Sequence, residues 1–260
     1  EIASDGTSRK TRFTFPLPPM ALAMHRGVLY YLVQNYDINS DNSYELMRYP
    51  LHGLSPKPKS IYKGQLERGT IQDLYPYGKY VYFLEHGGTW RFMMYDIEQQ
   101  TVRRIVSDDD SMAIILRGII GNRLYYQYFA GDLEDRQAWK LFSSDLEGND
   151  IQELPIQPEF LSEIYITDKH LFVVPVTAYL EEEPYKSKYG HVKREITVYD
   201  WNFRVVDRIA MSGWRRTTQL IPGDDRYLFA KQYDDEGQAQ FLYLDKSRLG
   251  SGNATFQPLF

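Results

Sequence analysis

Short runs of aromatic and aliphatic residues recur along the chain, each preceded by a turn residue and two less restricted positions. The runs lie at residues 27–31, 78–83, 121–126, 168–173 and 225–229. Runs of this length that are rich in Tyr, Phe and Val are typical of buried or half-buried β-strands. We therefore predict a strand at each position, and the spacing of roughly 45 to 50 residues between them indicates internal repeats.

Three further segments accompany each run and complete the repeat. One precedes the run, at residues 20–24, 71–75, 112–116, 164–166 and 218–221. A third strand follows each run, at residues 92–95, 141–144, 196–199 and 241–244, and in the first repeat it ends at Pro50. The last strand is predicted at residues 60–62, 102–106, 151–154, 205–210 and 255–259. Each repeat thus reads as a four-stranded antiparallel meander.

An acidic turn ends the third strand of most repeats. Asp96, Asp145, Asp200 and Asp245 stand at this position, and Pro50 replaces them in the first repeat. Asp starts a turn by accepting hydrogen bonds from nearby amides, whereas Pro does so by fixing φ. We predict that these carboxylates cap the connection to the last strand.

Four short strands per period are typical of the blades of a β-propeller, whose apolar faces need a neighbouring blade to cover them. We predict an all-β fold, a β-propeller of five four-stranded blades over residues 20–260. Closing the ring would cover both terminal faces. Residues 1–19 form an N-terminal segment with one strand at 11–15, which either pairs outside the last blade or belongs to a sixth blade. A sandwich or barrel is the alternative architecture.

Composition supports the all-β prediction and narrows the classes of function. Aromatic residues make up 15 % of the chain, and 22 residues are Tyr. The net charge of −5 is too small and of the wrong sign to favour a nucleic-acid partner. The chain has no Cys, which excludes disulfides and thiolate chemistry. No run approaches the roughly 18 apolar residues of a membrane span.

The phrases VYFLEHGGTWRFMMYDIEQQ and LYYQY, with WKLFSSDLEG after the latter, resemble the TolB-like and low-density-lipoprotein-receptor-type (YWTD-like) β-propeller repeats. The likeness covers most of residues 20–260, although the YWTD tetrapeptide itself is absent. Such domains often lie outside the cytoplasm of bacteria and serve as docking platforms. The resemblance therefore implies an extracytoplasmic, periplasmic or cell-surface scaffold. The polar start at Glu1, with no signal-peptide character, fits a segment from which a leader or anchor was removed, and it fits a trimmed cytoplasmic domain as well.

Binding residues are predicted on the rim formed by the loops between second and third strands and by the connections between blades. Residues 177–191 form the longest of these loops, and long loops in compact domains are often functional. The candidate contact residues are Tyr179, Tyr185, Tyr189 and His191 in this loop, with Trp214, Arg215 and Arg216 in the last connection. Aromatic residues and Arg are frequent anchors for a protein or saccharide partner.

Catalytic, metal and cofactor motifs are weak in this sequence. The acidic run at Asp108, Asp109 and Asp110 lacks the spacing of a calcium loop, so we predict no metal. No nucleophile elbow or phosphate-binding glycine loop occurs, and no cofactor is predicted. The enzyme alternative is a glycoside hydrolase with Asp73 and Glu163 on inner strands around the axial pocket. It predicts roughly 5 to 10 Å between their carboxyl groups.

Overall fold

A computed structural model describes residues 15, 17–35, 42–52, 57–66, 69–87, 89–106, 111–130, 139–156, 162–175, 195–210, 219–222, 226–233 and 238–259. The chain forms two compact units, residues 1–114 and 115–260, and the division between them falls within one strand, β9. The described elements are strands, apart from one short 3-10 helix, η3 (Lys246–Arg248).

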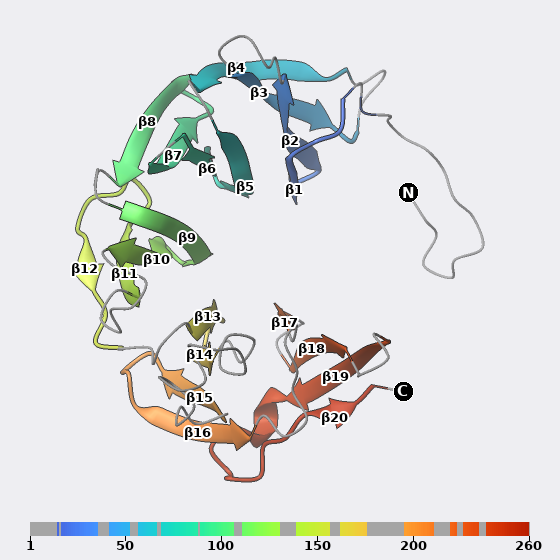
Figure 1. The fold of residues 1–260 in the computed structure, drawn as a ribbon, viewed down its shortest axis with the longest axis vertical. Helices are drawn as coiled ribbons and strands as arrows, with labels where there is room; N and C mark the ends of the chain where they lie inside the picture. The colour runs from blue at the N-terminus through green and yellow to red at the C-terminus, as the bar shows by residue number, and fades with distance from the viewer. Residues whose placement is uncertain are drawn as a thin grey trace, which may run out of the picture. The chain divides into compact units, whose positions relative to one another are not determined.

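The first unit contains two four-stranded sheets (Figure 1). Sheet 1 consists of β1 (Ala21–His25), β2 (Val28–Asn35), β3 (Asn42–Pro50) and β4 (Lys59–Leu66). Sheet 2 consists of β5 (Thr70–Tyr77), β6 (Tyr80–His86), β7 (Trp90–Asp96) and β8 (Thr101–Val106). In both sheets the strands pair antiparallel in chain order.

Three more sheets of the same kind follow. Sheet 3 consists of β9 (Ser111–Ile120), β10 (Arg123–Ala130), β11 (Trp139–Asp145) and β12 (Gln152–Glu153). Sheet 4 consists of β13 (Ser162–Ile166), β14 (His170–Pro175), β15 (Glu195–Asp200) and β16 (Val205–Ala210). Sheet 5 consists of β17 (Gln219–Pro222), β18 (Tyr227–Tyr233), β19 (Ala239–Asp245) and β20 (Gln257–Pro258). The predicted all-β fold with five four-stranded repeats is confirmed.

The second strand of each sheet supplies core residues to both of its faces. In β14, Leu171 and Val173 pack in a cluster with Leu141 of sheet 3. Phe172 and Val174, which alternate with them, pack in a cluster with sheet 5 that includes Leu228. Because successive side chains of a strand point to opposite faces, an uninterrupted apolar run is what a sheet buried on both faces requires.

Sheets 1 and 2 pack in the same way in the first unit. Tyr30 and Leu32 of β2 share one cluster with Val81 and Phe83 of β6. On β2, Tyr31 contacts the ring of Phe15 edge to face, with the ring centroids 5.0 Å apart. Phe15 is the last residue of the predicted N-terminal strand, and residues 11–14 lie outside the part that the structure describes.

Two glutamines connect successive sheets in equivalent ways. Gln34 Nε2 on β2 donates to the carbonyl of Gly69, just before β5, at 2.8 Å. Gln127 Nε2 on β10 donates to the carbonyl of Ser162, the first residue of β13, at 3.1 Å. Each bond ties a second strand to the start of the next sheet, and it satisfies a polar group that the sheet contact buries.

The acidic turns cap the backbone as predicted. Asp96 Oδ1 accepts from the amides of Glu98 and Gln99, and Asp200 Oδ1 accepts from those of Asn202 and Arg204. Asp245 caps η3 through the Ser247 amide at 3.0 Å. The Ser247 hydroxyl and Arg226 also bond to Asp245, and together they lower the pKa of its carboxyl to about 2.

A charged residue is buried between sheets 1 and 2. Glu85 on β6 is 4 % exposed, and it accepts a hydrogen bond from the hydroxyl of Tyr44 on β3. Arg91 Nη1 lies 3.5 Å from the other carboxylate oxygen. The ring of Tyr44 passes close over Gly64, where an added Cβ would lie 2.2 Å from the ring. A glycine is therefore needed on β4 for Tyr44 to reach the neighbouring sheet.

We expect Tyr44→Phe to lower the free energy of unfolding by about 1 to 3 kcal/mol, because it removes a hydrogen bond from a buried carboxylate. Urea denaturation followed by circular dichroism measures the change. The matched control is Tyr30→Phe, which removes a hydroxyl from the same apolar cluster but leaves the contacts of Glu85 in place. Equal effects of the two substitutions would contradict a role for the Tyr44–Glu85 bond.

We expect Asp245→Asn to destabilise the protein at neutral pH and to have a smaller effect in acid. The folded-state pKa of Asp245, about 2, lies below the ordinary value of 3.8, so its ionised form stabilises the fold above that value. This contribution is lost as the pH falls toward 2. Urea midpoints of wild type and variant should therefore converge between pH 5 and pH 2. A constant difference would be inconsistent with the role of the charge.

Candidate binding groove on the inner strands

The rim residues predicted from the sequence lie outside the described part of the chain. This applies to Tyr179, Tyr185, Tyr189 and His191 in the long loop, to Trp214, Arg215 and Arg216 in the last connection, and to Asp108, Asp109 and Asp110. Their grouping into one contact surface therefore stays a prediction.

One predicted rim hairpin, between β6 and β7, is described on both of its sides. His86 and Trp90 pair across the hairpin, and their rings stack with centroids 4.4 Å apart and planes 19° from parallel. Next to this pair, Glu85 on β6 and Arg91 on β7 face each other. The hairpin therefore carries an ordered aromatic pair at the end of sheet 2.

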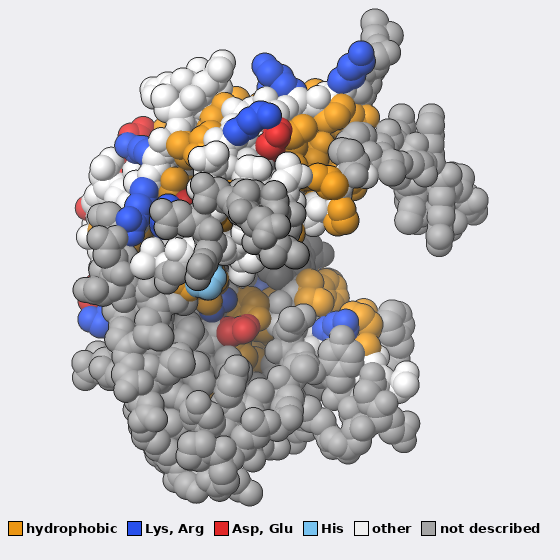
Figure 2. Space-filling view, turned by 45° about the horizontal axis from the view of Figure 1, so that its top comes forward, with side chains coloured by type: hydrophobic (Ala, Val, Ile, Leu, Met, Phe, Trp, Pro, Cys, Tyr) orange, Lys and Arg blue, Asp and Glu red, His pale blue; other side chains and the backbone are white. Residues whose placement is uncertain are grey.

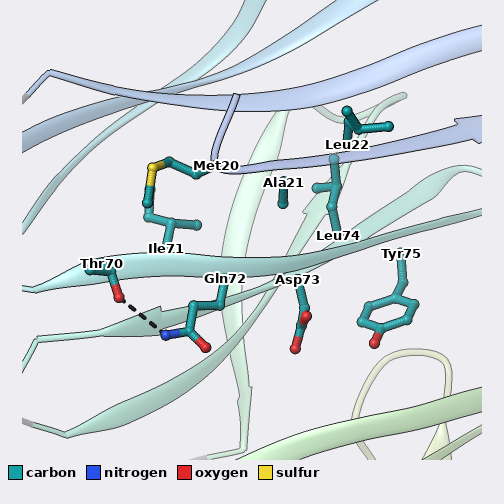
Figure 3. Close-up of a pocket in the computed structure, with 9 residues that line it drawn as sticks. All are labelled: Met20, Ala21, Leu22, Thr70, Ile71, Gln72, Asp73, Leu74 and Tyr75. Carbon is teal, nitrogen blue, oxygen red and sulfur yellow. Dashed lines mark hydrogen bonds between the residues drawn. The ribbon is translucent and has the colours of Figure 1, made fainter. Parts of the chain in front are cut away.

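A groove of about 550 Å³ lies between the first strands of sheets 1 and 2 (Figure 3). Residues 20–22 of the first strand and residues 70–75 of β5 line it. Ala21 pairs with Leu32 near the end of β2, and Thr70 pairs with His86 at the end of β6. The groove thus follows β5 from Thr70, at the rim end of sheet 2, to Tyr75, which pairs with Tyr82 toward the other end of β6.

Apolar side chains form both walls of the groove beside polar groups. Ile71 and Leu74 of β5 are buried in the core between sheets 1 and 2, and they form one wall. Met20 and Leu22 form the other wall and are 42 % and 57 % exposed. In Figure 3 Met20 lies over Ile71, and Leu22 lies on the same side as Leu74.

The exposure of the wall that contains Leu22 follows from the residue pattern of β1. Ala21 and Ala23 pack against the core, whereas Leu22 and Met24 alternate with them and point away from it. Met24 is 68 % exposed. Hydrophobic side chains, drawn in orange, reach the surface between charged ones in the upper part of Figure 2, where the strands of the first unit lie. Contiguous exposed apolar residues of this kind are typical of contact sites.

Polar groups line the middle of the groove. Gln72 Nε2 donates to the hydroxyl of Thr70 at 3.3 Å. Asp73 adopts a left-handed backbone conformation, with φ of 53°, at the point where the pairing of β5 with β6 shifts register. Asp is one of the few residues that tolerates this conformation, so Asp73 has a structural role in a β-bulge. Asp73 is one of the lining residues, and in Figure 3 its side chain lies on the same side of β5 as that of Gln72, away from Met20 and Leu22.

The second carboxylate of the enzyme alternative has a local partner of its own. Glu163 on β13 accepts a hydrogen bond from the hydroxyl of Tyr165 on the same strand. Burial, followed by the Glu163 carboxylate, raises the pKa of Tyr165. Asp73 and Glu163 belong to different compact units, so the distance expected between their carboxyl groups stays a prediction. Among the described residues that line the groove, Asp73 is the single carboxylate, whereas glycoside hydrolysis takes a pair. The glycoside hydrolase alternative is not favoured.

The described residues contain neither a group of metal ligands nor a membrane-spanning helix. In that part of the chain, no three His, Asp or Glu side chains are grouped so that they could hold a metal ion. Among the same residues, no helix is long and apolar enough to cross a membrane.

Sequence reasoning missed the groove, although one signal for it was present. A half-buried strand alternates apolar with polar residues, but residues 20–24, at the start of β1, read Met, Ala, Leu, Ala and Met. The small residues pack inward and the large ones point outward. This order of small and large apolar residues could have marked the strand as a contact surface.

Comparison with known proteins identifies the fold but no closer relationship. Neither a family model nor a curated protein sequence matches the chain. TolB from Acinetobacter baumannii superposes with a TM-score of 0.57 at 12 % identity, over 95 % of this chain and 56 % of that chain. Prolyl oligopeptidase B from Galerina marginata superposes with a TM-score of 0.62 at 13 % identity, over 90 % of this chain and 32 % of that chain.

The tricorn protease is a third similar structure, with a TM-score of 0.55 at 13 % identity, over 90 % of this chain and 26 % of that chain. The chain thus spans little more than half of TolB and about a third of prolyl oligopeptidase B. At these identities the likeness shows the fold alone. No family model supports the finer assignment to TolB-like or YWTD-like repeats. The chain has a β-propeller fold with five four-stranded blades.

Proposed function

We propose that this chain is a non-catalytic binding domain that docks a protein partner at the rim end of its propeller blades. The observation that carries this proposal is the apolar groove at β1 and β5, where Met20 and Leu22 are exposed beside the buried Ile71. Burying a Leu or Met side chain contributes about 1.5 to 3 kcal/mol, so a partner that covers these residues gains substantial affinity. Met also adapts its shape to different partners.

The backbone around the groove favours an extended segment of the partner. β1 and β5 are the edge strands of their sheets. Edge strands present main-chain donors and acceptors along one side, and extended peptides often dock beside them. The polar side chains of Thr70, Gln72 and Asp73 would then set the orientation of the bound segment. An apolar segment with one or two polar side chains fits this lining.

The rim loops extend the proposed contact surface. Tyr179, Tyr185 and Tyr189, together with Trp214, would present aromatic rings to a protein or saccharide partner, and Arg215 and Arg216 would add charge. The resemblance to TolB-like repeats supports a location outside the cytoplasm. A docking platform of this kind needs no cofactor.

We expect Met20→Ser combined with Leu22→Ser to weaken binding of groove peptides at least about tenfold, because two exposed apolar contacts are lost. The peptides are selected from a random display library on the whole chain, and Kd is measured by fluorescence anisotropy. The matched control is Ile151→Ser, which removes an apolar side chain that is 54 % exposed in sheet 3. Circular dichroism checks that all variants are folded. Equal affinity for the groove variant and the control would contradict the groove as a binding site.

A second experiment tests the rim. We expect Trp214→Ala together with deletion of residues 181–188 to reduce the capture of partners from a native extract, because the aromatic anchors are removed. Chemical crosslinking followed by mass spectrometry measures the capture, with the groove peptides as a control for correct folding. If every captured partner is retained at wild-type level, the rim residues have no role in docking.

A further inference from the structure

A second cavity, of about 290 Å³, lies between sheets 4 and 5 in the second unit. Its lining comes from the turn between β13 and β14, from the start of β18 and from η3. The lining residues are Thr167, Asp168, Lys169, His170, Arg226, Lys246 and Ser247. In each sheet this end carries the turn between first and second strands, so it is opposite to the rim hairpins. The proposed partner site does not include it.

The turn that forms one side of the cavity is rigidly held. Thr167 and His170 exchange backbone and side-chain hydrogen bonds, including one from the His170 amide to the Thr167 hydroxyl at 3.0 Å. The indole of Trp201 donates to the Thr167 carbonyl at 3.2 Å. A turn with this many bonds keeps its side chains in place before a ligand arrives, which lowers the entropic cost of binding.

Cationic side chains outnumber carboxylates around the cavity. Lys169, Arg226 and Lys246 line it, and Asp168 is the carboxylate that lines it with them. Two further carboxylates, those of Asp245 and Asp200, lie next to this lining and accept hydrogen bonds. Asp245 holds Arg226 and the η3 turn, and Asp200 accepts from the amides of its own turn. The Arg226–Asp245 pair is neutral as a whole, so the other charges of the lining are those of Lys169, Lys246 and Asp168.

His170 is the titratable group at the centre of this lining. Its Nδ1 is buried and has no hydrogen-bond partner among the described residues. Burial, followed by the positive charge of Lys246, lowers the pKa of His170. Lys169 acts in the same direction, whereas Asp168 and Asp200 act in the opposite one. A buried ring nitrogen without a partner is rare in proteins and often marks a missing ligand.

We propose that this cavity is a binding site for a small oxyanion, with phosphate as the chemical class that fits it. A phosphate would place negative charge between Lys169, Arg226 and Lys246 and would supply acceptors for the donors around it. It would also stabilise the charged form of His170. Binding of the anion and protonation of His170 are therefore coupled.

The test is a titration of the full chain with sodium phosphate at constant ionic strength, adjusted with sodium chloride. Imidazole resonances are followed by NMR over pH 5 to 8, and His170→Gln assigns the signal of His170. We expect the pKa of His170 to rise by about one unit when phosphate binds, because a nearby anion favours the imidazolium. His25, His52 and His86 serve as internal references.

A variant pair makes the result specific to the cavity. Lys169→Met combined with Lys246→Met is expected to weaken phosphate binding at least about tenfold and to abolish the shift of His170. The control is Lys63→Met, a lysine that is paired with Glu45 in sheet 1. An equal shift in chloride alone, a similar shift of all histidines, or a full shift in the double variant would each overturn the proposal.

Discussion

The structure depends on covering both faces of every four-stranded sheet. A sheet with apolar residues on two faces cannot be stable in water by itself, and within each compact unit successive sheets bury such residues against one another. The clusters between sheets 1 and 2, sheets 3 and 4, and sheets 4 and 5 show how this works. In each of them the second strands contribute alternate side chains. The Gln34 and Gln127 bonds then fix the start of the next sheet.

The repeat could be predicted from the sequence because its signals are local. Aromatic runs such as that in β6 identify second strands by composition alone. Each acidic turn contains its own hydrogen-bond partners within four residues, as at Asp145, whose carboxylate accepts from the amides of Glu147 and Asn149. Such signals do not depend on the rest of the fold. Strand order could be predicted from them because most connections are short, and a short connection favours antiparallel pairing of the strands that it joins.

The contacts between sheets could not be predicted, since they join residues that are distant in the sequence. Tyr44 and Glu85 are 41 residues apart, and nothing in either strand indicates that they meet. The same applies to the groove, which needs Leu22 of β1 and Ile71 of β5 side by side. Local patterns identified Asp73 as a polar residue on an inner strand, but they could not predict the left-handed bulge that it occupies. A register shift depends on the partner strand, so the alternation of residues along one strand does not predict it.

The distribution of chemistry over the two ends of the blades supports binding as the role of the fold. At the rim end of the first unit, the exposed residues are large and apolar beside a buried wall, which favours association by desolvation. At the opposite end of sheets 4 and 5, a small cavity gathers Lys169, Arg226 and Lys246 around a half-buried histidine, which favours association by charge. The core between the blades needs neither feature, because its apolar side chains are already covered by the neighbouring sheets. Blade packing does not require Leu22 to be exposed or Lys169 to line a cavity, and the two proposed binding sites give each of these residues a role.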